Sequence, residues 1–222
     1  MNYRFLILHF SFYILLSCQN KSADLEKFES ILGTEKSEVL TELTDDFENE
    51  YLAKKYPDSD LSKSYLKFME EMAKHNFPKR EEIISEENEK KYRESGLFDE
   101  KYSFPDSVWI ENQGVVINWV YEGSNGKIQS DRAFRPLNSK NLAHKDSILK
   151  IEKNQFRFNR YGNYRKALEA VKEESQFIDL YYTYVTKVGL VGSSVLFPEI
   201  RDNKLDISGP VERRVLVLDM IY

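Results

Sequence analysis

The chain has 222 residues, of which 32 are Lys or Arg and 37 are Asp or Glu, giving a formal net charge of −5. This balance argues against nucleic acid or an anionic membrane surface as partner, because binding to either requires a basic patch. The length suffices for one buried core, and 14 Tyr and 14 Phe supply large rings to fill it.

The first eighteen residues are laid out like a secretory signal peptide. Arg4 provides a basic start, an apolar run covers residues 5–16, and the small residue Ser17 precedes Cys18. The apolar run has about 12 residues, which is short for a membrane-spanning helix of about 20 residues. Residues 15–18, Leu-Leu-Ser-Cys, resemble the lipobox of bacterial lipoproteins.

The lipobox resemblance implies a membrane anchor at Cys18. It implies cleavage after Ser17, a diacylglycerol thioether on the sulfur, and further acylation, by palmitate for example, of the new amino terminus. Several acyl chains make such an anchor durable. Cys18 is the only cysteine in the chain, so its acylation leaves no thiol for catalysis or a disulfide. Gln19 is not the aspartate that marks inner-membrane retention in enterobacterial lipoproteins, so the resemblance favours the outer membrane of the cell envelope and leaves the leaflet open.

After a polar tether over residues 18–24, the chain up to Gly96 has the pattern of four helices. Gly33 suits the end of the first helix, Pro57 follows the second, and Pro78 fits the first turn of the fourth. The fourth helix is mostly charged and should lie on the surface. In the first three helices the apolar positions at helical spacing should face the core: Leu25, Phe28, Leu32, Leu40, Leu43, Phe47, Tyr51, Leu61, Tyr65, Phe68, Met69 and Met72.

Residues 104–160 are expected to form a small antiparallel sheet. Residues 108–110 and 115–121 are rich in β-branched and aromatic side chains, as strands are. Asn125-Gly126 then gives the strongest short signal for a hairpin turn, because both residues tolerate a positive φ. Residues 127–134 would be the returning strand.

The sheet is expected to end with a second hairpin, between residues 148–151 and 156–158. From Tyr164 onward, apolar residues keep a spacing of three and four, which favours one long helix over a strand in residues 177–188. Residues 211–222 have features of both helix and strand, and we favour a helix there because Pro210 suits a helix start.

These elements predict an α+β fold with helices at both ends around a small antiparallel β-sheet. The element order and the segment 159–168 loosely resemble uncharacterised lipoproteins of Bacteroidota, which implies no known activity. The expected organisation is a signal peptide at 1–17, a lipidated tether at 18–24 and a single domain at 25–222, helical over 25–96, sheet over 104–160 and mainly helical over 163–222.

No motif with the spacing of a catalytic or metal site is found in the sequence. His75 and His144 lie in polar stretches, and neither has a second histidine at the spacing of a zinc site. Residues 202–209 resemble a calcium loop in part, but Lys204 and Arg213 occupy positions where that loop requires oxygen ligands. We therefore expect no catalytic residue, no metal and no cofactor.

The aromatic residues of the predicted sheet are the best candidates for a binding surface. Most large rings in proteins are buried, so a core role is the default expectation for them. Trp109 and Tyr121 flank the ends of the hairpin, which makes them the pair most suited to face outward. Arg132 and Arg135 on the returning strand could add polar contacts beside them.

These features favour a non-enzymatic binding or assembly role at the cell envelope. Its partners would be the lipid bilayer, reached through Cys18, and an envelope protein or glycan. One alternative is an immunity or inhibitor lipoprotein that intercepts a toxin. Another is a hydrolase whose carboxylates come together only in the folded chain, which sequence spacing cannot reveal.

Overall fold

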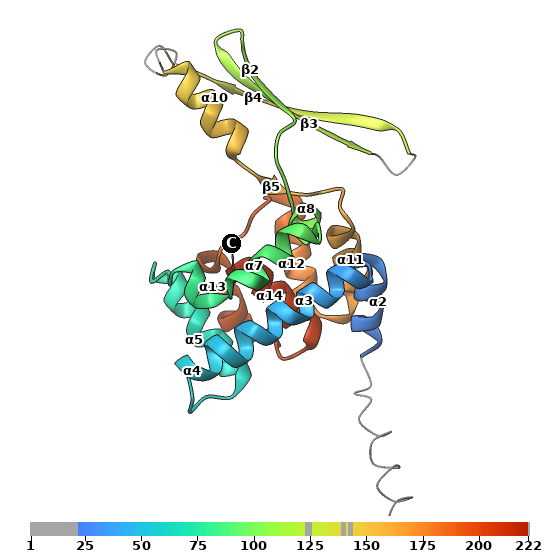
Figure 1. Ribbon diagram of the computed structural model, residues 1–222, viewed down its shortest axis with the longest axis vertical. Helices are drawn as coiled ribbons and strands as arrows, with labels where there is room; N and C mark the ends of the chain where they lie inside the picture. Colours follow the sequence, from blue (N-terminus) through green and yellow to red (C-terminus); the bar gives the residue numbers. More distant parts are fainter. Residues whose placement is uncertain (1–21, 123–125, 139–140, 142–143, 222) are drawn as a thin grey trace, which may run out of the picture.

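The computed structural model describes residues 22–122, 126–138, 141 and 144–221 (Figure 1). The predicted signal peptide and Cys18 lie outside the described residues. The structure has the expected α+β fold, and its sheet stands at one end of a helical body (Figure 1). We call residues 104–156, which contain this sheet, the β-arm, and the other described residues the helical body.

The helical body is built from two stretches of chain. The first contains α2 (Ala23–Leu32), α3 (Thr34–Asp46), the π-helical turn η1 (Phe47–Leu52), α4 (Ala53–Lys55), α5 (Leu61–Ala73), α6 (Arg80–Ile83), α7 (Glu86–Glu94) and α8 (Leu97–Lys101). The second contains α11 (Asn163–Val171), the 3-10 turn η2 (Lys172–Glu174), α12 (Gln176–Lys187), α13 (Ser193–Asn203) and α14 (Pro210–Met220).

The core of the body confirms the predicted inward-facing residues. Nine of the twelve are buried, and Tyr51, Leu61 and Met72 are half-buried against the same cluster. The C-terminal segment is helical as favoured, and Val215 to Leu218 are all fully buried in α14. Four consecutive buried apolar residues leave this turn of the helix without a polar face, which is why its sequence also suited a strand.

Two expected helices are interrupted. The expected fourth helix, which begins near Pro78, is divided into α6 and α7 by the extended Ile84. The side chain of Ser85 then caps α7 by accepting a hydrogen bond from the N–H of Asn88. The expected long helix after Tyr164 is also wrong, because η2 and the extended Ser175 separate α11 from α12. Residues 177–188 are helical as favoured.

The three-stranded sheet of the β-arm has the order β2 (Ser107–Glu111), β3 (Gly114–Glu122), β4 (Ile128–Pro136), and all its pairs are antiparallel. Asn112 and Gln113 link the first two strands with positive φ angles of 47° and 60°. Of the expected second turn, Asn125 lies outside the described residues, while Gly126 has a φ of 71°. The first hairpin prediction is confirmed by the pairing of Glu122 with Ile128.

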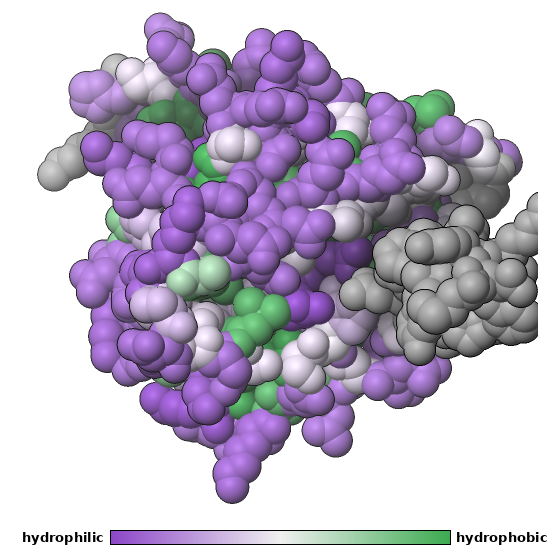
Figure 2. Space-filling model, turned by 60° about the horizontal axis from the view of Figure 1, so that its bottom comes forward, coloured by the Kyte–Doolittle hydropathy of each residue, from purple (hydrophilic) through white to green (hydrophobic). Residues whose placement is uncertain are grey.

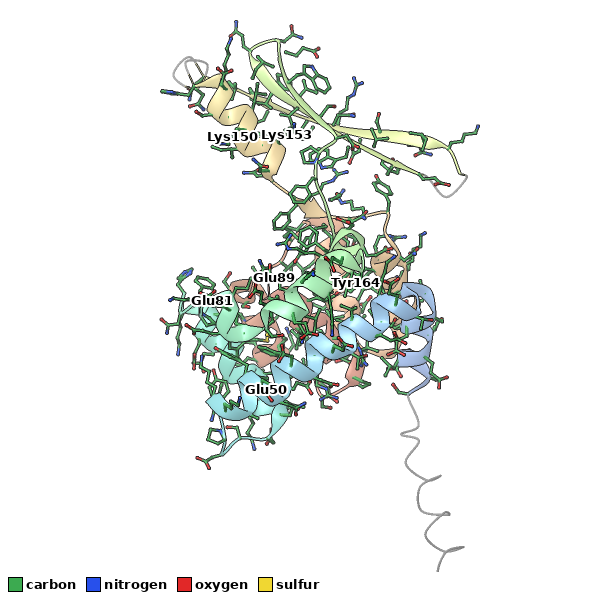
Figure 3. All side chains as sticks on the ribbon, in the orientation of Figure 1. Glu50, Glu81, Glu89, Lys150, Lys153 and Tyr164 are labelled. Atoms are coloured by element: carbon green, nitrogen blue, oxygen red, sulfur yellow. The ribbon has the colours of Figure 1, made fainter. Side chains whose placement is uncertain are left out.

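The expected second hairpin is wrong, because its first strand is part of helix α10 (Lys145–Asn154). Ile148 and Leu149 of this helix pack against the buried Val115 and Ile117 of β3, and side chains fill the space between them (Figure 3). These residues form a small apolar cluster of the arm, separate from the core of the body.

Two short strands join the arm to the body. β1 (Tyr102–Ser103) pairs with β5 (Arg157–Phe158) at the root of the arm. Just before β1, the buried Lys101 lies 2.5 Å from Asp219 of α14, and the Tyr181 hydroxyl donates to the same carboxylate oxygen at 2.8 Å. Breaking such a buried pair is costly, so it ties the root of the arm to the C-terminal helix.

Candidate functional site

A groove of about 1220 Å³ opens between the β-arm and the helical body. We call it the arm–body groove. One wall comes from β3 and β4, and the other from α8 and the loop that precedes α11. Its lining includes Lys36, Glu100, Phe104, Trp119, Tyr121, Gln129, Arg157, Asn159, Arg160, Tyr161 and Lys166.

The wall from the arm is one face of the sheet. Alternate residues of a strand share a face, so Trp119 and Tyr121 lie on the same side of β3 as Val115 and Ile117. We call this side the inner face. Helix α10 covers Val115 and Ile117, whereas Trp119 and Tyr121 border the groove. The inner face is therefore part core and part binding surface.

The Trp119 ring lies under a guanidinium. Cζ of Arg157 is 3.8 Å from the ring centroid, and Nη1 of Arg157 is 2.8 Å from the Asp131 carboxylate of β4. The Nε atoms of Trp119 and Arg157 are buried without a hydrogen-bond partner among the described residues. This wall therefore holds donors that the described part of the chain leaves unpaired.

Tyr121 bridges the groove by stacking on Tyr161. Their ring centroids are 3.4 Å apart, and the rings are inclined by only 4°. Burial, together with a hydrogen bond to Tyr121, raises the pKa of Tyr161 to about 12. The stack links β3 to the loop before α11, and so links the sheet to the body.

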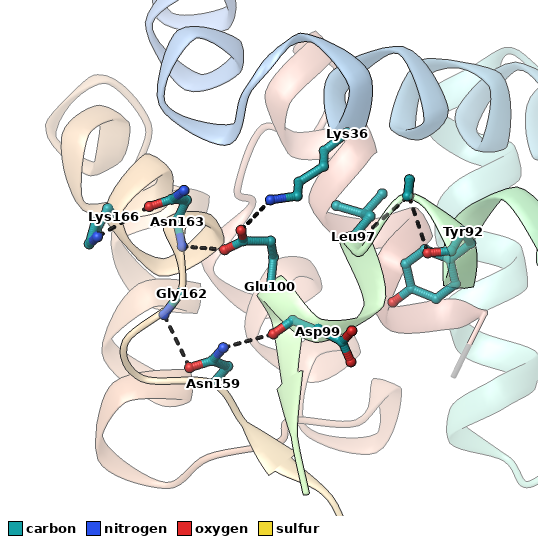
Figure 4. Close-up of polar contacts among 10 residues, drawn as sticks. Lys36, Tyr92, Leu97, Asp99, Glu100, Asn159, Gly162, Asn163 and Lys166 are labelled. Carbon is teal, nitrogen blue, oxygen red and sulfur yellow. Dashed lines mark hydrogen bonds and ion pairs between the residues drawn. The ribbon is translucent and has the colours of Figure 1, made fainter. Parts of the chain in front are cut away.

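The loop that carries Tyr161 is fixed by its own sequence (Figure 4). The side-chain oxygen Oδ1 of Asn159 accepts hydrogen bonds from the backbone N–H groups of Tyr161 and Gly162, at 3.0 and 3.1 Å. The Asn159 amide also donates to the backbone oxygen of Asp99 at 2.7 Å. Such a turn, with a side chain replacing a backbone partner, is typical of Asn.

Glu100 ties the same loop to α3. Its side chain is 14% exposed, and it accepts hydrogen bonds from Lys36 Nζ at 2.5 Å and from the backbone N–H of Asn163 (Figure 4). A carboxylate is favourable at this place, because Asn163 begins α11 and a helix N-terminus attracts negative charge. Both oxygens of Glu100 are therefore engaged in holding the groove together.

Arg160 is the cation of the groove that stays available to a ligand. It is exposed, and it makes no ion pair or hydrogen bond with the described residues. The neighbouring Lys166 donates to the side chain of Asn163 at 3.1 Å. The groove thus combines stacked rings with a guanidinium that can donate several hydrogen bonds.

The four predicted surface residues do not form one site. Trp109 and Arg132 lie on the opposite side of the sheet from the groove, which we call the outer face, with the guanidinium 5.7 Å from the ring centroid. Tyr121 borders the groove, and Arg135 pairs with Glu152 of α10. Only Tyr121 belongs to the arm–body groove.

Arg157, Arg160 and Tyr161 are among the groove residues that the sequence did not single out. Arg157 lies in β5 and the other two follow it, and a strand of two residues carries little pattern of its own. The sequence did contain one signal that shows which face of the sheet a side chain lies on. The short link at residues 112–113 places Trp109 opposite Val116, and therefore on the other face from Tyr121.

No family model, curated protein or solved structure matches this chain. Among the described residues, no group of three or more His, Cys, Asp or Glu side chains is placed to hold a metal ion. Within the same residues, no helix has the length and apolar character needed to cross a bilayer.

Proposed function

We propose that this protein is an envelope lipoprotein, anchored through acylated Cys18, that binds an envelope protein or glycan in the arm–body groove. The observation that carries the proposal is the groove itself, where stacked aromatic rings lie beside the exposed guanidinium of Arg160. Rings stack on sugar or peptide planes, and a guanidinium pairs with carboxylate, carbonyl or hydroxyl oxygens.

The position of the groove supports this role. Helix α2 begins on the side of the body opposite the β-arm (Figure 1). Ser22 is the fourth residue after Cys18, so at about 3.5 Å per extended residue the two lie at most about 14 Å apart. A lipid at Cys18 would therefore hold the body close to the bilayer and direct the arm and its groove away from it.

The surface of the body also fits a lipid anchor. The face in Figure 2 is mostly hydrophilic, and its apolar residues form several small, separate areas. Binding to a bilayer through protein surface alone requires a broad apolar or basic face. On this face, membrane attachment would have to come from acyl chains.

The anchor predicts the behaviour of a Cys18→Ser variant of the full chain. In bacterial cells fed an alkyne-tagged palmitate, the unmodified chain should take up the label and sediment with membranes. The variant should lose the label, since Cys18 is the only cysteine available to form the thioether. A variant that keeps the label and its membrane association would contradict the anchor.

The groove predicts the behaviour of an Arg160→Glu variant. Tagged full chain, extracted from membranes with mild detergent, should recover an envelope protein or glycan whose yield falls at least about tenfold in the variant, since charge-assisted contacts give more than one factor of ten in affinity. Arg201→Glu makes the same charge change on α13, outside the groove, and should keep the yield. Equal yields from both variants would refute the groove as the binding site.

A further inference from the structure

Strand β4 is a long edge of the sheet without a partner strand. The sheet order places it beside β3 only, and eight of its nine residues are exposed. An edge strand presents a row of free N–H and C=O groups, and natural proteins usually shorten it, cover it or interrupt it. In the described residues, no other strand or helix makes a backbone hydrogen bond to β4.

The register of the sheet shows which backbone groups of β4 point outward. Leu137 N–H donates to the oxygen of Gln113, its directly opposite residue, at 2.9 Å. Hydrogen-bonded pairs alternate along an antiparallel ladder, so the odd-numbered residues of β4 bond to β3. The even-numbered ones, including Arg132 and Phe134, direct their N–H and C=O outward. Pro136 also occupies an even position, so the hydrogen bonds between β4 and β3 do not require the N–H that proline lacks.

We propose that β4 pairs with β4 of a second copy of this chain, antiparallel and centred on Ala133, so that two arms share a six-stranded sheet. In this register Ala133 faces Ala133 of the second copy in a non-hydrogen-bonded pair. Arg132 then faces Phe134 in a pair whose outward N–H and C=O groups bond across the interface. The small Ala133 suits the centre, because side chains approach most closely at such a pair.

The charges of β4 fit this register. Asp131 of each copy would face Arg135 of the other, which gives two ion pairs across the interface. Within one copy Asp131 already pairs with Arg157, and Arg135 with Glu152. Joining them produces a chain of alternating charges, Glu152, Arg135, Asp131 and Arg157, across the interface. The Asp131 and Arg135 side chains are 39% and 52% exposed, so both have room for a second partner.

Two neighbouring registers place like charges opposite each other. A shift that centres the pair on Arg132 sets two guanidinium groups against each other, and one centred on Asp131 does the same with two carboxylates. Like charges directly opposite destabilise a sheet. In the favoured register Arg132 instead meets the Phe134 ring, which is 55% exposed, in a cation–π contact.

The test uses an Ala133→Cys variant of the full chain in membranes. Opposite residues of a non-hydrogen-bonded pair have Cα atoms about 4.5 Å apart, a distance that a disulfide spans. A mild oxidant should therefore convert the variant to a covalent dimer that reductant reverses, while the parental chain stays monomeric. Gln129→Cys is the matched control. It lies exposed on the same face of β4, and its two copies would be about 26 Å apart at about 3.3 Å per residue.

A second pair of variants tests the backbone contacts. Adding Arg132→Pro to Ala133→Cys should lower the dimer yield at least about tenfold, because it removes an outward N–H from each copy. Adding Arg132→Ala keeps that N–H and should lower the yield less. Circular dichroism should show that all variants are folded. The proposal would be overturned if the folded Ala133→Cys chain stayed monomeric or if Gln129→Cys formed dimers equally well. It would also be overturned if Arg132→Pro left the dimer yield undiminished, or if residue 133 were cross-linked to a strand of a different protein.

Discussion

At the scale of single residues, Gly162 lies where the loop with Tyr161 crosses the backbone of α8. A Cβ atom at this position would come 2.5 Å from the Glu100 backbone oxygen and 2.9 Å from Nδ2 of Asn159. Backbone atoms cannot move aside as a flexible side chain can. The φ of Gly162 is −67°, so the close approach, and not the conformation, requires glycine here.

We expect Gly162→Ala to destabilise the protein by about 1–3 kcal/mol, the usual cost of overpacking. It should also displace Tyr161 from Tyr121 and weaken binding in the groove. Gly192→Ala is the matched control, since Gly192 also precedes a helix at negative φ and its Cβ would meet only Ser194 Oγ, at 3.9 Å. Urea unfolding of both variants measures the difference, and equal stabilities would contradict the proposed contact.

The groove could not be predicted at this scale, because its residues come from distant parts of the chain. Lys36, Glu100 and Tyr161 come from three separate parts of the body, and Tyr121 joins them only where the arm meets the body. None of them belongs to a short motif whose spacing implies chemistry. The ring pair and the Glu100 contacts depend on tertiary structure, which a local pattern does not encode.

At the scale of elements, the sequence predicted those helices that have both an end signal and an apolar stripe. Helix α2 ends at Gly33, whose φ is +97°, and α5 begins after Asp60, whose carboxylate accepts from the N–H of Lys63 at 2.9 Å. Helix α10 has no side-chain cap at its N-terminus and no glycine at its end, and its apolar residues suit a strand equally well. Packing of Ile148 and Leu149 on the sheet determines its structure.

The β-arm should unfold separately from the body, because its apolar cluster is small and distinct. Ile117→Ala should lower the free energy of unfolding of the arm by about 2–5 kcal/mol, because the apolar cluster of the arm has few other buried residues. Both tryptophans of the chain, Trp109 and Trp119, are in the arm, so their fluorescence reports on the arm, while circular dichroism at 222 nm reports mainly on the helical body.

In urea, the fluorescence transition of Ile117→Ala should move to lower concentration and precede the loss of ellipticity. Leu43→Ala, in the core of the body, should move the ellipticity transition instead. Coincident transitions that shift together in both variants would show one cooperative unit and would contradict this independence of the arm.

At the scale of the whole molecule, the aromatic residues divide by type. The fully buried tyrosines all lie in the body, and both tryptophans lie in the arm. Since acylation of Cys18 would leave no thiol for a disulfide, the stability of the body would rest on burial and on contacts such as those of these tyrosines. Tyr65, for example, donates to Glu48 at 2.9 Å, and Arg213 also pairs with that carboxylate.

This division predicts how stability depends on alkaline pH. Burial raises the pKa values of Tyr65, Tyr102, Tyr164 and Tyr181 well above 10, whereas in the unfolded chain they ionise near 10. Because the folded protein favours the neutral hydroxyl, the contribution of each of these tyrosines to the free energy of unfolding is complete below about pH 10 and is lost as the pH rises further. Each such tyrosine increases the unfolding constant about tenfold per pH unit above about 10.

Absorbance at 295 nm should therefore show these tyrosines ionising in one step that coincides with the loss of helical ellipticity. Gradual ionisation of all tyrosines before any loss of ellipticity would show that the body leaves these hydroxyls open to solvent.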